Sequence, residues 1–329
     1  MTEMQQRLMD FIEREFRPGT SPSQLNRLAG DASERQYFRY QNQSGEAVIL
    51  TAYPEPFDPD TFTYQQVYHL FREIGLPVPE IIALDGELGI VLQEDLGNES
   101  LQDRLLTAAE KERRELLHQA IDHIVTIQQK GTKALNPEYE ASVLAFDEEK
   151  LNSELLFFNR HFLEGYRELK VTQEDSLKEE FTRLSTELAG LPRLLCHRDY
   201  HVRNLMLKDG KLYIIDFQDA RLGPLSYDVV SLLKDSIELD TQEVDEYRDY
   251  YLSRASLTHK VGDFLRQFHL MCIQRLLKAL GTYGFQITER GNALYQQYVS
   301  GSLQRVLLSL RAVPEFPYLQ RIVEGSLTQ

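Results

Sequence analysis

The chain has 329 residues, and its 36 basic and 51 acidic side chains give a formal net charge of −15 at pH 7. This acidity argues against a nucleic-acid surface and against a patch for anionic membranes. The length suits two lobes that share a large core. No apolar run approaches the roughly 20 residues of a membrane span, and the N-terminus lacks a signal-peptide pattern, so we expect a cytoplasmic protein.

The pattern of the first 95 residues predicts an antiparallel sheet with flanking helices. Apolar residues at spacings of three and four are typical of helices, and runs rich in Tyr, Phe, Val and Ile between turn residues are typical of strands. We expect helices over 4–16 and 61–74, and five strands, three of them within 24–53 and the others over 80–84 and 89–94.

A turn within this sheet carries hydrogen-bond donors. Backbone N–H groups of the segment from Gly30 to Ser33 can bind phosphates, and Ser33 and Arg35 add side-chain donors. One glycine does not make a glycine-rich loop, and an ordinary hairpin turn explains the same residues. These residues alone leave both interpretations open.

The composition changes near Asp95. The strand over 89–94 runs into Glu94-Asp95-Leu96-Gly97, and from Ser100 onward the apolar residues recur at helical spacing. We therefore predict an N-terminal lobe over 1–95 and a C-terminal lobe over 96–329. The segment at the boundary is either a surface loop or a hinge between the lobes.

The stretch from Leu194 to Ala220 is the most informative part of the chain. Asp209-Gly210 between two apolar runs is a strong signal for a two-residue hairpin. We expect a strand over 194–196, a polar loop over 197–204, and hairpin strands over 205–208 and 211–215. The loop carries Asp199 and Asn204, and Asp216 follows the last strand, so these side chains should meet at one edge.

This set of side chains suits phosphoryl transfer. That reaction needs a carboxylate that orients the attacking hydroxyl and accepts its proton, and oxygen ligands for Mg²⁺. Asp199 suits the first role, whereas Asn204 and Asp216 suit the second, because Mg²⁺ takes few protein oxygens and keeps water and phosphate as its other ligands. Polar residues that merely cap turns in a hairpin are the simpler interpretation.

The motif His197-Arg198-Asp199-x-x-x-x-Asn204, followed by a strand that ends in Ile-Asp-Phe, resembles the catalytic and metal-binding loops of the protein-kinase-like superfamily, in its aminoglycoside phosphotransferase branch. The segments HRDYHVRNLM and IDFQDAR are most similar to the bacterial kinases that phosphorylate the anomeric hydroxyl of N-acetylmuramate and N-acetylglucosamine. The resemblance implies a bilobal α+β fold, with an N-terminal antiparallel sheet plus helix and a mainly helical C-terminal lobe. It also implies ATP and Mg²⁺ as cofactors, and a small amino sugar as substrate in cell-wall recycling.

The resemblance extends to the nucleotide side. Gly-Asp-Ala-Ser over 30–33 with the following Arg35-x-Tyr-Phe-Arg lies where the subgroup covers the phosphates, which assigns Gly30, Ser33 and Arg35 to ATP. The backbone at Glu94 to Leu96 would read the adenine edge. The global acidity does not oppose this, since a local cationic site binds phosphates whatever the net charge.

In the catalytic loop the resemblance gives His197 and Arg198 a bracing role. Most of the superfamily also has a phosphate-binding lysine on the third strand, but EAVILTAYP lacks one. The next helix has Gln65 and Gln66 where a partner glutamate is usual. Arg35 is our candidate replacement for the lysine.

Residues beyond the motif are expected to support it. Asp219 and Arg221 form a plausible ion pair that orients the metal-binding loop, and Asp228 is predicted to be a helix cap or a tie to the catalytic loop. The two cysteines, Cys196 and Cys272, belong to no CxxC pair, so the sequence indicates buried thiols and no disulfide framework or zinc site. The helical segment 241–329 indicates packing and no chemistry.

Alternative functions remain open at this level. One is a kinase of the same fold with another acceptor, such as an aminoglycoside, choline, a hydroxy amino acid or a ketosamine, because fold does not determine the acceptor. The other is a nucleotide-binding pseudokinase, which the missing lysine suggests. We expect a long helix over 146–169. Its segment ELLFFNRHF, with His161, resembles the acceptor-side helix of the subgroup, but an ordinary core stripe explains its apolar residues equally well.

Overall fold

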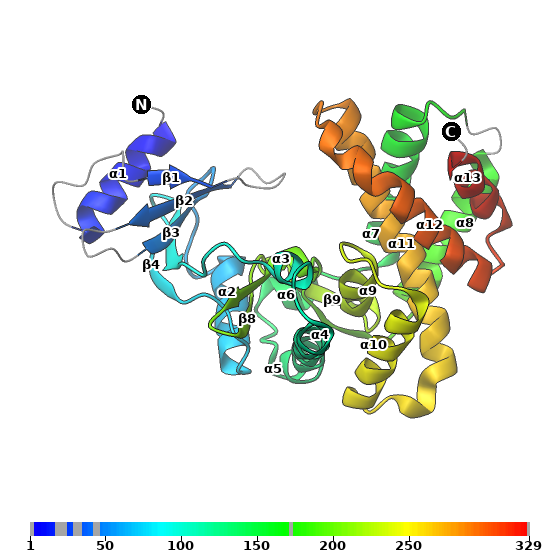
Figure 1. The fold of residues 1–329 in the computed structure, drawn as a ribbon. Helices are drawn as coiled ribbons and strands as arrows, with labels where there is room; N and C mark the ends of the chain where they lie inside the picture. The colour runs from blue at the N-terminus through cyan, green and yellow to red at the C-terminus, as the bar shows by residue number, and fades with distance from the viewer. Residues whose placement is uncertain (1–2, 17–24, 29–34, 42–46, 171–173, 328–329) are drawn as a thin grey trace.

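The computed structural model describes residues 3–16, 25–28, 35–41, 47–170 and 174–327. Two lobes follow one another along the chain, with the N-terminal sheet on one side of the molecule and the long C-terminal helices on the other (Figure 1). This is the predicted mixed α+β architecture.

The N-terminal lobe contains the predicted five-stranded sheet. All neighbouring strands are antiparallel, and their order is β1-β2-β3-β5-β4. The predicted helices and strands are confirmed, with boundaries that differ by one or two residues. The elements are α1 (Glu3–Phe16), β1 (Leu25–Arg27), β2 (Gln36–Gln41), β3 (Ala47–Ala52), α2 (Thr63–Glu73), β4 (Ile81–Asp85) and β5 (Ile90–Glu94).

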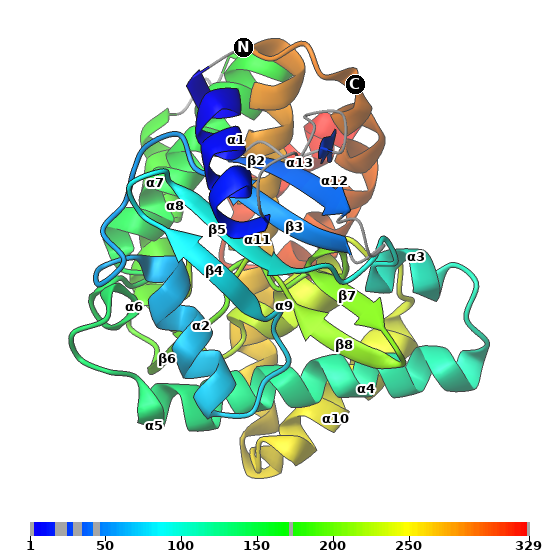
Figure 2. The ribbon, with the colours of Figure 1, turned by 90° about the vertical axis from the view of Figure 1, so that its left-hand side faces the viewer.

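The two faces of this sheet pack against different partners. Side chains alternate along a strand, so Ile90 and Leu92 of β5 join the cluster buried beneath α1, whereas Val91 between them joins the large core shared with the C-terminal lobe. Helix α1 crosses the sheet on one face (Figure 2). Helix α2 buries its apolar stripe, which includes Phe71, in the large core. The N-terminal lobe is therefore joined to the C-terminal lobe by continuous apolar packing.

The C-terminal lobe is mainly helical. Its helices begin with α3 (Leu101–Leu105), which is capped because Ser100 and Asp103 form a reciprocal capping box. Two helical segments are π-helical, Ile127–Gly131 and Asn159–Tyr166. The other helices are α4 (Glu110–Thr126), α5 (Thr132–Ala134), α6 (Glu140–Val143), α7 (Glu148–Phe158), α8 (Glu174–Ala189), α9 (Tyr227–Lys234), α10 (Thr241–Arg254), α11 (Val261–Thr288), α12 (Gln296–Ala312) and α13 (Pro317–Leu327).

Helix α11 is the central support of this lobe, with 28 residues packed along α7, α9 and α12. Two glycines allow a close approach to α7 and the π-helical turn after it. A Cβ atom at Gly284 would lie 2.3 Å from the carbonyl oxygen of His161, and one at Gly281 would lie 2.9 Å from the Cα of Phe158. Larger residues would separate these helices.

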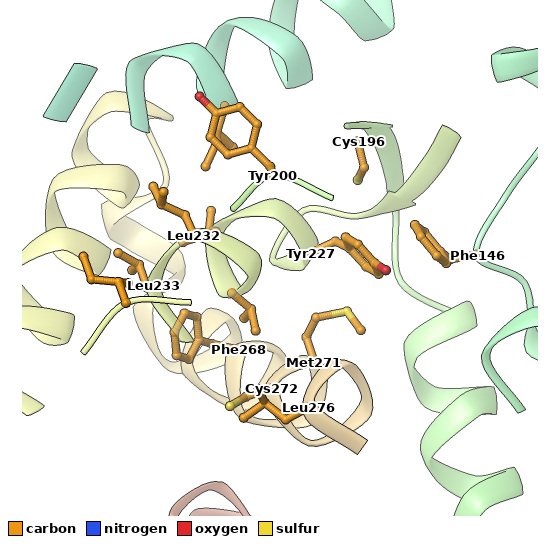
Figure 3. Packing of buried hydrophobic residues seen from close by; sticks show 14 of the residues in the cluster. Phe146, Cys196, Tyr200, Tyr227, Leu232, Leu233, Phe268, Met271, Cys272 and Leu276 are labelled. Carbon is orange, nitrogen blue, oxygen red and sulfur yellow. The ribbon is translucent and has the colours of Figure 1, made fainter. Parts of the chain in front are cut away.

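The core beneath the catalytic loop combines aromatic and sulfur-containing side chains with leucines (Figure 3). Tyr227 stacks on Phe146 with ring centroids 4.0 Å apart, and Cys196 lies beside them. Both cysteines are free and buried, as predicted, and burial raises the pKa of each thiol. Among the described ranges, no helix combines the length and apolar character that crossing a bilayer requires.

Candidate active site

Two short β-ladders fix the catalytic loop. β7 (Leu205–Lys208) and β8 (Lys211–Ile214) form the predicted hairpin. Asp209 and Gly210 both have positive φ, 52° and 73°, as a two-residue hairpin turn of the primed type requires. The strand before the loop, β6 (Arg193–Cys196), pairs with β9 (Arg221–Pro224), a pairing that the sequence did not predict. The loop is thus anchored at both ends.

The predicted residues Asp199, Asn204 and Asp216 lie together. The side-chain amide nitrogen of Asn204 donates to the backbone carbonyl of Asp199 at 2.9 Å and faces a carboxylate oxygen of Asp216 at 3.4 Å. Because the amide nitrogen makes these contacts, the amide oxygen is left for a cation. Two oxygen donors at one edge fit Mg²⁺ that arrives with nucleotide phosphates and water.

The backbone is strained at two positions beside this cluster. Arg198 has φ of 85° and Asp216 has φ of 61°. Positive φ is uncommon outside glycine and is found where the surroundings impose it, often at functional sites. The strain turns the side chains of these two residues relative to their neighbours.

Asp228 holds the catalytic loop from below. Its buried carboxylate accepts hydrogen bonds from the backbone N–H groups of His197, at 2.7 Å, and Arg198, at 3.1 Å. The ring Nε2 of His197 lies 3.0 Å from the carbonyl of Ile215 and so connects the loop to the hairpin. The interpretation of Asp228 as a tie to the loop is confirmed. Such bonds to a charged acceptor are stronger than neutral ones.

Arg198 and Arg221 share one carboxylate. Their guanidinium groups lie 3.0 and 3.6 Å from Asp219, so the expected Asp219–Arg221 pair exists and includes Arg198 as a third member. The Nε of Arg198 also lies 3.8 Å from Asp199. This network connects the catalytic loop to the segment after Asp216.

Helix α11 contributes two cations that the sequence analysis missed. The ammonium group of Lys278 lies 3.5 Å from Asp199, and Arg275 donates to the backbone carbonyl of Arg198 at 2.7 Å. Burial alone would raise the pKa of Asp199, but Lys278 and Arg198 outweigh it and hold that pKa well below its usual range. Asp199 therefore stays ionised at neutral pH.

The expectation that residues 241–329 provide packing alone was wrong. The helical periodicity of α11 is real, but Arg275 and Lys278, three positions apart on one face, point toward the catalytic loop. An arginine within the mostly apolar stretch from Leu270 to Leu277 was the available signal, because a charge on an apolar face needs a partner. The partners are about 80 positions away in sequence, so the pattern could not identify them.

Arg35 of the N-terminal lobe reaches the same cluster. Its guanidinium lies 3.1 Å from one carboxylate oxygen of Asp216, which also accepts from Gln218 at 2.9 Å. Burial would lower the pKa of Arg35, but Tyr37, Asp216 and Tyr53 raise it, so this side chain stays charged. A positive charge therefore already lies beside the carboxylate that was predicted to bind metal. Gly30 and Ser33 lie outside the described residues.

The absence of the strand lysine is confirmed for β3, which reads Ala-Val-Ile-Leu-Thr-Ala. The glutamines on α2 do not replace its usual partner in the site, since the side chain of Gln66 accepts from the backbone N–H of Glu140. Tyr64 instead donates to Gln93 and stacks on Phe217, next to Asp216. Among the described residues of the N-terminal lobe, Arg35 is thus the cation that reaches the cluster.

The boundary segment is held by charged contacts. Lys208 pairs with Glu94 at 2.7 Å and donates to the carbonyl of Asp95 at 2.9 Å, while Arg39 pairs with Asp95 at 2.6 Å. The backbone N–H of Glu94 donates to Glu80 within the sheet, so that N–H is not available to adenine. That the backbone from Glu94 to Leu96 reads the adenine edge stays a prediction.

Comparison with known proteins agrees with this geometry. Residues 24–270 match the phosphotransferase enzyme family. The chain belongs to this family. As a family member it is an ATP-dependent small-molecule kinase, a phosphotransferase that acts on an alcohol group.

Two relatives are especially similar in sequence. The chain is 33% identical to the N-acetylmuramate/N-acetylglucosamine kinase of Neisseria meningitidis over 282 residues, which cover 83% of this chain and 79% of the relative. It is also 33% identical to the protein of the same name from Pseudomonas aeruginosa, over 80% of this chain and 76% of that one. The resemblance seen in the motifs is therefore confirmed.

Solved structures show the same fold at low identity. A choline/ethanolamine kinase family protein from Mesorhizobium loti superposes with a TM-score of 0.61 at 15% identity, over 99% of this chain and 100% of that chain. An ADP-bound aminoglycoside phosphotransferase superposes with a TM-score of 0.58 at 13% identity, over 91% and 96%. These kinases confirm the predicted fold class.

Proposed function

We propose that this kinase transfers the terminal phosphoryl group of ATP to the anomeric hydroxyl of N-acetylmuramate or N-acetylglucosamine, in the recycling of cell-wall sugars. The names of the relatives support the acceptor. The convergence of Asp199, Asn204 and Asp216 carries the proposal, because it supplies a base and two oxygen donors in one place. A cytoplasmic location belongs to the proposal, since the donor is ATP.

Asp199 has the central role in this proposal. Its carboxylate orients the acceptor hydroxyl and accepts its proton, and Lys278 and Arg198 keep it ionised. Bound Mg²⁺ would neutralise charge that develops on the phosphates, and Asn204 and Asp216 would hold it. His197 and Arg198 brace the loop through their bonds to Asp228 and Ile215.

On the nucleotide side, Arg35 anchors the phosphates in place of the strand lysine. A guanidinium can bind phosphate oxygens with two parallel hydrogen bonds, and Arg35 is already beside Asp216. Gly30 and Ser33 would add donors over the phosphates. The carbonyl of Glu94 and the N–H of Leu96 would hold adenine. We place the lobe boundary near Asp95, which gives lobes 1–95 and 96–329.

The test is an acceptor panel with purified enzyme, ATP and Mg²⁺, scored for sugar-1-phosphate. We expect product with one or both amino sugars, and little with aminoglycosides, choline, hydroxy amino acids or ketosamines. Turnover with another acceptor alone would replace the proposed substrate, and no turnover with any would favour the pseudokinase.

The same panel should be run with the variant Asp199→Asn, which tests the role of Asp199 as the base. It keeps the shape of the side chain but removes proton acceptance, so we expect kcat to fall on the order of 10²-fold or more. Circular dichroism and nucleotide binding should remain as in the wild type. Wild-type turnover by this variant on the true acceptor would remove Asp199 from the role of base.

A further inference from the structure

A cavity of about 510 Å³ adjoins the catalytic loop on the C-terminal lobe. Val202 and Arg203 of the loop form part of its wall, Gln102 of α3 another part, and Tyr283 of α11 and Tyr298 of α12 a third part. Helices α3 and α12 lie on the same side of the molecule (Figure 2). Asp199, Asn204, Asp216 and Arg35 are not among the residues that line this cavity.

Two of the three arginines that line the cavity are held by protein groups. Arg113 pairs with Glu243 at 3.4 Å. Arg305 donates to the backbone carbonyls of Lys234, at 2.7 Å, and Asp235, at 2.8 Å. These contacts fix the two side chains as parts of the wall.

Arg203 differs from them. Within the part of the chain that the structure describes, its guanidinium makes no hydrogen bond or ion pair, and its Nε, like that of Arg113, is buried without a hydrogen-bond partner. Burial would raise the pKa of the Asp235 carboxylate, but Arg275, His201 and Arg203 lower it, so Arg203 acts on Asp235 through charge alone. Asp235 lines the same cavity, but its carboxylate accepts from Arg275 at 3.2 Å, and Glu238 is exposed at the rim. A partly buried guanidinium without a protein partner is costly unless a ligand supplies the acceptor.

The two tyrosines that line the cavity, Tyr283 and Tyr298, suit a sugar ring. The rings of Tyr283 and Tyr298 lie 5.8 Å apart, with Tyr283 buried and Tyr298 exposed at the mouth. Aromatic faces with polar edges, together with a few fixed polar groups, are typical of pockets for small polar ligands. A carboxylate is the group that a guanidinium binds best, through two parallel hydrogen bonds.

We propose that Arg203 binds the carboxylate of the acceptor and so selects N-acetylmuramate, which carries a lactyl carboxylate, over N-acetylglucosamine, which carries none. This inference rests on the proposed function. Arg203 follows Asp199 by four positions, a span of at most about 14 Å between Cα atoms. Both residues belong to the same short loop, whose Val202 and Arg203 line the cavity. The proposal places the anomeric hydroxyl of the sugar at Asp199 and its carboxylate in this cavity.

The test compares kcat/KM for the two sugars in the wild type and in Arg203→Gln. We expect the ratio of N-acetylmuramate to N-acetylglucosamine to fall about 10- to 100-fold, mainly through the KM for N-acetylmuramate. Any damage to the catalytic loop affects both sugars and cancels in the ratio. Arg203→Lys keeps the positive charge but cannot bind a carboxylate with two parallel hydrogen bonds. It should therefore retain part of the preference for N-acetylmuramate.

The matched control is Arg114→Gln, which removes an arginine that pairs with Glu246 outside the cavity and should leave the ratio unchanged. An unchanged ratio in Arg203→Gln, or an equal fall in the control, would overturn the subsite while the proposed function stands. A wild type that phosphorylates N-acetylglucosamine alone would also overturn it. A wild type inactive on both sugars would overturn the proposed function and the subsite with it.

Discussion

The catalytic loop is held by several buried groups of the C-terminal lobe, whereas the described residues of the N-terminal lobe reach the same cluster through the ion pair of Arg35 with Asp216. Below the loop, Asp228 and Arg275 hold backbone groups of His197 and Arg198. From the other side, Arg35 contacts Asp216 at 3.1 Å. Asp199, the proposed base, is therefore on a loop that the protein itself holds in place, and the proposed phosphate anchor Arg35 contacts Asp216.

The hydrophobic cores of the two lobes also differ, because the core of the N-terminal lobe is much the smaller. The cluster beneath α1 contains few side chains, among them Leu8, Phe11 and Leu50, whereas the core of the C-terminal lobe continues through α2 as far as Val91. Phe217, directly after Asp216, packs against Tyr64 and Phe71 of α2. The segment proposed to bind metal thus rests on the larger core. The comparison predicts that variants on the two sides will fail in different ways.

The largest effect should come from Asp216→Ala. Loss of this carboxylate removes a proposed metal ligand, so we expect kcat to fall on the order of 10²-fold or more and the Mg²⁺ requirement to rise sharply. Activity titrated against Mg²⁺ at fixed ATP measures both. A metal titration like that of the wild type would exclude Asp216 from the metal site.

Asp228→Ala should break the support on the C-terminal side. It leaves two backbone donors without their buried acceptor, so we expect a loss of about 2–5 kcal/mol in the free energy of unfolding and lower kcat. Urea unfolding followed by circular dichroism measures the loss. The control is Asp219→Ala, whose carboxylate is more exposed and should cost less. Equal stability of the two variants would contradict the buried tie.

Arg35→Met should affect nucleotide binding rather than stability. Arg35 supplies the proposed phosphate anchor of the N-terminal lobe, so we expect the KM for ATP to rise about 10-fold while the melting temperature stays near that of the wild type. Arg27→Gln changes an exposed arginine on β1 and serves as the control. An unchanged KM for ATP in Arg35→Met would assign phosphate anchoring to another residue.

The smallest expected effect is a shift in pH dependence in Lys278→Met. Lys278 helps to hold the pKa of Asp199 down, so its removal raises that pKa and a larger fraction of Asp199 becomes protonated at low pH. The acid limb of kcat/KM should therefore move to higher pH, with a loss of about 10-fold or less near neutral pH. Lys278→Arg keeps the charge and should restore the wild-type profile. An unmoved acid limb would show that Lys278 does not act on the base.

Local signals predicted the elements and the catalytic loop. Asp209-Gly210 imposed a turn that only residues tolerant of positive φ adopt readily, and this turn fixed the hairpin and the edge where Asp216 emerges. The spacing from Asp199 to Asn204 then placed both on one short loop. These interactions span few residues, so the sequence contains almost all that decides them.

The sequence by itself determined the elements, the hairpin and the cluster of Asp199, Asn204 and Asp216, because turn chemistry and side-chain periodicity act over a few positions. Only the tertiary structure brought Lys278 and Arg275 to the catalytic loop, Arg35 to Asp216, and Arg203 to a cavity with Tyr283. Those contacts depend on the packing of helices and sheets that are distant in sequence. Periodicity shows which face of a helix is buried, but not which charged group it meets there.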